Sequence, residues 1–154
     1  MANEKGFDQI LWLDAKEFKY VQEVGTMNLM FVIGNKVVTP ATTGTILKGI
    51  TRDSLLKICK YKGIEFEERP VTIDEIVEAH LDGSLTECFG AGTAAVVSNV
   101  IKIQHGDVEM NLPPVEERTI APLLKNEING LRSGRIEDVN NWVVPVKNFA
   151  EITA

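Results

Sequence analysis

The chain has 154 residues, enough to bury the core of one domain. Hydrophobic residues make up 44% of the sequence and charged residues 25%, as in ordinary globular proteins. The formal net charge of −6 disfavours a nucleic-acid partner, since such partners select basic surfaces. No apolar run is long enough to cross a bilayer, and the first residues lack the apolar core of a signal peptide. We therefore expect a cytoplasmic protein with no nucleic-acid or membrane partner.

The few cysteines and histidines argue against disulfide and metal chemistry. Cys59 and Cys88 are far apart and match neither a disulfide framework nor a zinc-ligand spacing, which favours a reducing cytoplasm. His80 and His105 are too few for a His-based metal site or a catalytic triad. We therefore expect no metal ion and interpret the cysteines as small core residues.

The first part of the chain predicts strands joined by turns. Apolar residues indicate a buried strand over 9–13, and alternating side chains indicate another over 18–24. The nearly continuous apolar run at 27–33 is typical of a strand covered on both faces. A Gly-Asn turn at 34–35 then leads into a strand over 36–39, so the last two strands should form a hairpin.

Helices and further strands follow. A helix is expected over 51–62 and ends at Gly63, and a second begins with the capping box of Thr72 and Glu75 and stops at Gly83. A third helix is expected over 120–131; strands are expected at 64–67, 85–89, 94–103 and 108–112, with an extended or strand-like tail at 142–146. Because hairpins join most strands, this order favours an α/β (α+β-like) fold with a mixed, largely antiparallel sheet.

Glu23 is the first residue with possible chemistry. It lies next to apolar residues and just before Gly25, where a buried carboxylate would be costly without a partner. The plain interpretation is a strand-end glutamate that faces water or pairs with a lysine, since most glutamates are exposed.

Two glycine-containing segments could approach a ligand with their backbone. The run Gly49-Ile50-Thr51 opens a predicted helix, where free N–H groups and the helix dipole favour phosphate, although it can also be a simple cap. The run Phe-Gly-Ala-Gly-Thr-Ala at 89–94 lets the backbone come close to a ligand, or is a glycine-rich connection between strands.

Taken in order, three segments resemble the C-terminal part of a branched-chain amino-acid aminotransferase, a fold-type IV enzyme that uses pyridoxal 5′-phosphate (PLP). They are Glu-Val-Gly-Thr-Met-Asn at 23–28, Gly-Ile-Thr-Arg-Asp at 49–53 and Phe-Gly-Ala-Gly-Thr-Ala at 89–94. The resemblance runs from residue 5 to the region of Trp142. It implies a sheet or pseudo-barrel with flanking helices, as in the C-terminal domain of that family.

The resemblance assigns cofactor contacts to five residues. Glu23 would lie against the pyridine nitrogen and keep it protonated, so that the ring accepts electrons. Gly49, Ile50 and Thr51 would bind the phosphate through the start of the helix. The Thr93 hydroxyl would reach the same phosphate.

The resemblance also assigns substrate contacts. Thr26 and Met27 would line the side-chain pocket, and the N–H groups of Thr93 and Ala94 would meet the α-carboxylate. The complete enzyme would move the amino group of leucine, isoleucine or valine to 2-oxoglutarate. Its partners would be these amino acids and 2-oxo acids, with a homodimer in the full-length protein.

Several positions depart from the family pattern. Ala91 stands where members often have Thr or Ser, and Lys48 stands where they often have Pro. Ala95 and Ser98 replace the Cys-x-x-Cys pair of mammalian members, so we expect no redox switch. Lys48 lies at the phosphate end of the expected site and is not interpreted as the lysine that forms the family's Schiff base.

That lysine belongs to a segment before a Gly-Asn-Tyr turn, which this sequence does not contain. We therefore expect residues 1–154 to form a single C-terminal, cofactor-binding domain of a larger aminotransferase, with no catalytic residue in this chain and the N-terminal domain absent. The alternatives are a non-catalytic domain that binds PLP or a partner subunit, and a truncated reading frame without function alone. Another fold-type IV enzyme, such as a D-amino-acid transaminase or an aminodeoxychorismate lyase, is disfavoured by the motif at 23–28.

Overall fold

The computed structural model describes residues 2–144 and residue 146. Its strands are β1 (Leu11–Leu13), β2 (Val21–Val24), β3 (Met27–Ile33), β4 (Lys36–Pro40), β5 (Phe66–Arg69), β6 (Leu85–Gly92), β7 (Val96–Asn99), β8 (Lys102–His105) and β9 (Val108–Asn111). The α-helices are α1 (Ile50–Lys62), α2 (Ile73–Leu81) and α3 (Ile120–Arg132), and the 3₁₀ helices are η1 (Ala2–Lys5) and η2 (Val115–Glu117). Among these described residues, no helix is both long and apolar enough to cross a membrane.

Strand β3 is the centre of a seven-stranded sheet. One edge of β3 pairs with β6, while its other edge pairs first with β2 and then with β4. These pairings are antiparallel, whereas β5 joins β4 in parallel because α1 connects them. Strands β8 and β9 form a separate antiparallel hairpin. The predicted mixed, largely antiparallel sheet is therefore confirmed.

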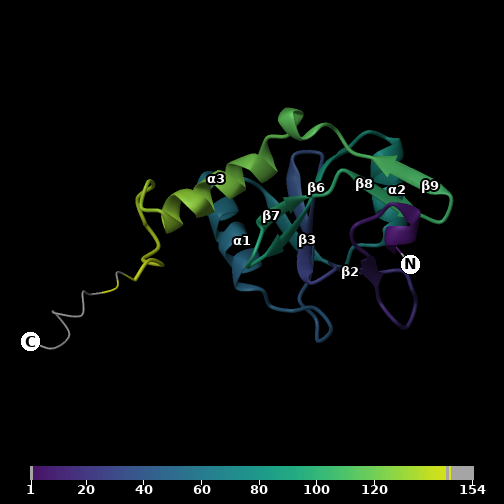
Figure 1. Cartoon of the computed structure of the whole chain (residues 1–154), viewed down its shortest axis with the longest axis horizontal. Helices are drawn as coiled ribbons and strands as arrows, with labels where there is room; N and C mark the ends of the chain where they lie inside the picture. Colours follow the sequence, from purple (N-terminus) through teal and green to yellow (C-terminus); the bar gives the residue numbers. More distant parts are fainter. Residues whose placement is uncertain (1, 145, 147–154) are drawn as a thin grey trace, which may run out of the picture.

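The sheet separates two apolar cores, because alternate side chains of β3 point to opposite faces. Met30 and Val32 pack with α1 and α3, whereas Leu29 and Phe31 pack with α2 and the β8–β9 hairpin. Figure 1 shows α1 and α3 on one side of β3, β6 and β7, with α2, β8 and β9 on the other. The apolar run at 27–33 thus is a strand covered on both faces, as predicted.

The helix signals are also confirmed. Gly63 follows α1 with a φ of 71°, the left-handed conformation that glycine adopts easily. Thr72 accepts a hydrogen bond from the amide of Glu75 at 3.1 Å, which is the predicted cap of α2.

Two early strands are shorter than predicted. The strand expected over 9–13 is limited to β1, which is not buried, since Trp12 is 50% exposed. The strand expected over 18–24 is limited to β2. The reason is Asp14, whose carboxylate accepts hydrogen bonds from the amides of four later residues and so folds 14–20 into a turn: Lys16, Glu17, Lys19 and Tyr20.

Later boundaries also differ from those predicted. The strand expected at 64–67 is β5, shifted because residues 66–69 pair with β4. The strand expected at 85–89 is β6, which continues through the glycine-rich motif to Gly92. The stretch at 94–103 contains a turn followed by β7 and the start of β8, and the strand expected at 108–112 is β9. The predicted tail has no regular structure at 142–144 or 146, and residue 145 lies outside the described residues.

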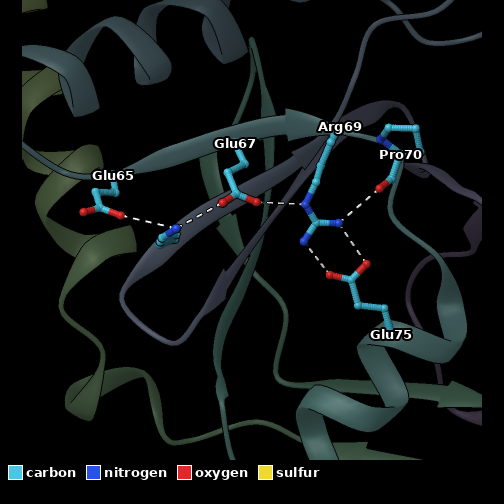
Figure 2. A network of polar contacts seen from close by, with 6 residues as sticks. Glu65, Glu67, Arg69, Pro70 and Glu75 are labelled. Carbon is cyan, nitrogen blue, oxygen red and sulfur yellow. Dashed lines mark hydrogen bonds and ion pairs between the residues drawn. The ribbon is translucent and has the colours of Figure 1, made fainter.

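Charged side chains cover strand β5, which pairs with one neighbour only in the described sheet. Glu67 forms an ion pair with Lys36. Figure 2 shows Arg69 between Glu67 and Glu75 of α2, with both carboxylate oxygens of Glu75 accepting from the Arg69 guanidinium. Glu75 is the main cause of the raised pKa of Arg69. Exposed charges on an unpaired strand oppose pairing with another molecule.

Glu87 joins β6 to α3. Glu87 is only 3% exposed, and its two carboxylate oxygens accept hydrogen bonds from the amides of Thr119, Ile120 and Ala121 at 2.7–2.8 Å. Three N–H donors and the positive end of the helix dipole compensate a buried carboxylate. The N-terminus of α3 is therefore capped by a residue from a distant strand.

The Asp14 turn makes stability depend on pH. Hydrogen bonds from the amides of Glu17, Tyr20 and Lys19 lower the pKa of Asp14 from 3.8 to about 2. A carboxyl with a lowered folded-state pKa adds stability above its unfolded-state pKa and loses it as the pH falls through the folded-state value. Asp14→Asn should therefore lower the free energy of unfolding at neutral pH, and the difference should disappear between about pH 4 and pH 2.

Urea unfolding at several pH values measures this difference, with the exposed Asp8→Asn as a control for the loss of one negative charge. A loss of stability that is the same at neutral and acid pH would contradict the role given to Asp14.

Candidate functional site

Glu23 lies in a closed group of hydrogen bonds with Asn28 and Leu47. Its Oε1 accepts from Asn28 Nδ2 and from the Leu47 amide, both at 3.1 Å. Asn28 Nδ2 also donates to the Leu47 carbonyl at 2.8 Å. Within the described residues, the carboxylate is thus neither an isolated surface group nor paired with a lysine. Because both hydrogen bonds go to Oε1, Oε2 is the oxygen able to meet a ligand.

Leu47 connects this group to the start of α1. Gly49 is the N-cap, with no side chain to satisfy the helix amides, and its carbonyl accepts from the Asp53 amide at 3.0 Å. The N–H groups of the first turn, at Ile50 and Thr51, therefore remain available to an anion. Ile50 is 84% exposed, so this end of the helix is open.

The charged neighbours of this helix start differ in where they point. Lys48 is exposed beside Gly49. Arg52 is buried and donates to the Pro40 carbonyl at 2.9 Å and to Glu68 at 2.8 Å. The guanidinium of Arg52 is therefore committed to β4 and β5 and is not the anion ligand.

Thr93 and Ala94 occupy the exposed turn between β6 and β7. The turn closes through Val96, whose φ of 62° is rare for a β-branched residue, and the Val97 amide donates to the Ala95 carbonyl at 2.7 Å. Burial of Val96 in the core shared with α1 and α3 offsets the cost of this conformation. The backbone that presents Thr93 and Ala94 is therefore fixed by packing.

Strand register brings the three segments to one end of the sheet. Glu23 pairs with Asn28 across β2 and β3, and Asn28 pairs with Ala91 across β3 and β6. The end of β6, the turn that carries Thr26 and the Leu47 loop therefore all lie at the start of β3.

Met27 has a different position. Side chains of adjacent strand residues point to opposite faces, so the Met27 side chain does not share the face of Asn28 and Glu23. It fills space left by two glycines of β6: a Cβ at Gly90 would lie 2.9 Å from Met27 Cε, and one at Gly92 would lie 2.9 Å from Met27 Cγ. The assignment of Met27 to the substrate pocket stays a prediction, to which its side-chain placement lends no support.

Met27 instead lines a cavity of about 730 Å³ on the opposite face. Its walls come from the N-terminal segment, β1, β3 and the region of β7 and β8, and include Leu11, Val24, Leu29 and Ile103. Among the residues predicted to bind cofactor or substrate, Met27 is the one that lines it. This cavity is therefore separate from the group around Glu23.

Neither cysteine is a nucleophile at neutral pH. Burial raises the pKa of Cys59 to about 11, and burial also raises the pKa of Cys88. Both lie in the core, as predicted.

Three contributors were not assigned from the sequence. Asn28 stood in the first motif without a role, Leu47 was not singled out, and Gly90 was not predicted to accommodate Met27. The signal for Asn28 was a polar residue at the start of an apolar strand, where a buried amide needs partners.

Position 49 has room only for a glycine. Its φ of −65° and ψ of 131° suit any residue, but a Cβ would lie 2.1 Å from Asn28 Oδ1. Gly49→Ala should therefore lower the free energy of unfolding by about 1–3 kcal/mol, as overpacking does. Gly44→Ala is the matched control, because a Cβ there meets nothing within 4 Å. Equal urea midpoints for the two variants would contradict the contact between Gly49 and Asn28.

Comparisons with known proteins identify the family of the chain. A family model described as amino-transferase class IV matches residues 1–103. A probable branched-chain-amino-acid aminotransferase of Staphylococcus aureus (strain N315) is 46% identical over 148 residues, 96% of this chain and 41% of the relative. The chain spans about two fifths of the length of the curated relatives it matches.

Solved structures share the fold. The branched-chain amino acid aminotransferase of Escherichia coli matches with a TM-score of 0.76 and 27% identity, over 96% of this chain and 45% of that one. An aminotransferase from Brucella abortus bound to PLP matches with a TM-score of 0.63 and 29% identity, over 82% and 41% of the two chains. On this evidence the chain belongs to the class IV aminotransferase family.

Proposed function

We propose that this chain is the C-terminal, cofactor-binding domain of a PLP-dependent branched-chain amino-acid aminotransferase. The complete protein would transfer the amino group of leucine, isoleucine or valine to 2-oxoglutarate. The observation that carries the proposal is the meeting of Glu23, the uncapped start of α1 and the β6–β7 turn at one end of the sheet. The names of the similar proteins support the choice of substrates.

The start of α1 suits the phosphate of PLP. The N–H groups of Ile50 and Thr51, which follow the N-cap Gly49, have no side-chain cap, and the helix dipole favours a dianion there. The exposed Lys48 adds positive charge nearby. The Thr93 hydroxyl, on the turn at the same end of the sheet, would complete the phosphate contacts.

Glu23 suits the ring nitrogen. Its Oε1 accepts from two N–H donors, so the carboxylate has a fixed orientation, while Oε2 can accept a hydrogen bond from the protonated ring nitrogen. When bound, PLP supplies an aldehyde and an electron-accepting ring that stabilises negative charge at the amino acid's Cα. Glu23 would hold the proton on the ring nitrogen and so keep the ring electron-poor.

The substrate would lie toward the two exposed turns. The amides of Thr93 and Ala94 would receive its α-carboxylate, and Thr26 on the β2–β3 turn would border its side chain. The backbone of the β6–β7 turn is held by the buried Val96, so these donors need little reorganisation to bind.

The remaining parts of the site would come from outside this sequence. These are the reactive lysine, another phosphate ligand and the rest of the substrate pocket, which an N-terminal domain would supply. The full-length protein would be a homodimer. Exposed apolar side chains at this end, Leu47 and Ile50, fit a surface that another domain covers. The free, buried Cys59 and Cys88 fit a cytoplasmic protein.

A PLP titration of the 154-residue chain tests the proposed function. Thr93→Val removes a hydroxyl that would bond a charged phosphate, so the dissociation constant should rise about tenfold or more. Thr86→Val, on the same strand as the motif, removes a hydroxyl that bonds Val32 instead and should leave the constant unchanged. No binding by the unchanged chain, or equal constants for both variants, would count against the proposal.

Reduction with borohydride in the presence of PLP tests whether the reactive lysine lies elsewhere. We expect scattered labelling of surface lysines and no stoichiometric adduct on one of them, as measured by intact mass and peptide mapping. A single full adduct that disappears in Lys48→Arg would show that this chain carries its own reactive amine and would sink this part of the proposal.

A further inference from the structure

Asn28 is a buried amide whose two side-chain protons are both used in bridging. It is 4% exposed, and Nδ2 donates to Glu23 Oε1 at 3.1 Å and to the Leu47 carbonyl at 2.8 Å. A primary amide has two donors on one nitrogen, so a single side chain can bridge a strand and a loop in this way. Asn28 therefore ties β2 to the loop that precedes α1.

The loop before α1 is held by hydrogen bonds to both backbone groups of Leu47. The Leu47 carbonyl accepts from Asn28, and the Leu47 amide donates to Glu23. The Gly49 amide then donates to the Leu47 carbonyl at 2.8 Å. The position of Leu47 thus sets where the first turn of α1 begins.

Gly49 confines Asn28 on its other side. A Cβ at Gly49 would lie 2.1 Å from Asn28 Oδ1 and 3.4 Å from Asn28 Cγ, so the real backbone closes over this amide. The amide is therefore fixed by hydrogen bonds at Nδ2 and by contact with the α1 N-cap at Oδ1. It cannot turn without moving Glu23, Leu47 or the helix start.

We propose that Asn28 is a positioning residue that fixes the spacing between the Glu23 carboxylate and the first turn of α1. The inference rests on the proposed function, in which these two points hold the ring nitrogen and the phosphate of one rigid ligand. A rigid ligand binds tightly only when both contacts are made together, since preorganisation lowers the cost of binding. Asn28 would act through Glu23 and Leu47 without touching the ligand.

PLP affinity of Asn28 variants in the whole chain tests this. Asn28→Asp keeps the shape but replaces both donors with an acceptor that faces two other acceptors. Asn28→Ala removes the bridge without adding charge. Each should raise the PLP dissociation constant about tenfold, a loss of about 1.4 kcal/mol. Thr86→Val is the control, because the half-buried Thr86 donates to the Val32 carbonyl at 3.4 Å, at the other end of β3 from Asn28, and bonds neither Glu23 nor Leu47; its constant should stay within about twofold.

A double variant separates positioning from general loss of stability. If Asn28 acts through Glu23, Glu23→Gln combined with Asn28→Ala should weaken PLP binding by less than the product of the two single effects. A full product would overturn the inference. In the ligand-free chain, Asn28→Ala should also speed hydrogen exchange of the Leu47 amide, whereas Thr86→Val should not.

The outcomes distinguish the two proposals. If the unchanged chain does not bind PLP, the proposed function fails and the inference fails with it. If the chain binds PLP and Glu23→Gln and Thr93→Val weaken binding, but the Asn28 variants behave like Thr86→Val, the inference alone is wrong.

Discussion

The carboxylate of Glu23, shared between the Asn28 amide and the Leu47 backbone, is the interaction on which the site depends. It joins the strand pair β2–β3 to the loop before α1. A buried amide of this kind is costly unless its donors are used, and here both are. The cost of burying Asn28 is thereby offset by two hydrogen bonds, and the positions of three backbone segments become mutually dependent.

The rest of the fold places this group where a ligand can reach it. Strand β3 is packed on both faces, so its start is a fixed point, and β6 brings the β6–β7 turn to the same end. Glycines at 90 and 92 admit Met27 on the far face. Glu87 anchors α3, which covers the core that holds Val96. Packing thus supports exposed backbone donors at Thr93 and Ala94, while the ligand surface itself stays open.

Much of the fold follows from local patterns. The apolar run of β3, the glycine after α1 and the Thr72–Glu75 cap were each sufficient to predict their elements, because the relevant contacts are within a few residues. The strand predicted at 18–24 was too long because hydrogen bonds from four backbone amides to the Asp14 carboxylate compete with strand formation. The alternation of polar and apolar residues does not reveal these hydrogen bonds. The cap of α3 by Glu87 and the bridge from Asn28 to Leu47 join residues far apart in sequence, so neither could be read from spacing. The motifs indicated a PLP site, but the face of the sheet on which the Met27 side chain lies could be determined only from the strand register.

Nitrogen–proton correlation spectra of the chain during a PLP titration would test the central claim most directly, namely that one ligand engages both the first turn of α1 and the β6–β7 turn near the start of β3. The account predicts concerted changes at the amides of Ile50 and Thr51 and at those of Thr93 and Ala94, all with one dissociation constant. Changes confined to residues that line the cavity on the other face, such as Leu13, Ile101 and Ile103, with both turns unaffected, would contradict it.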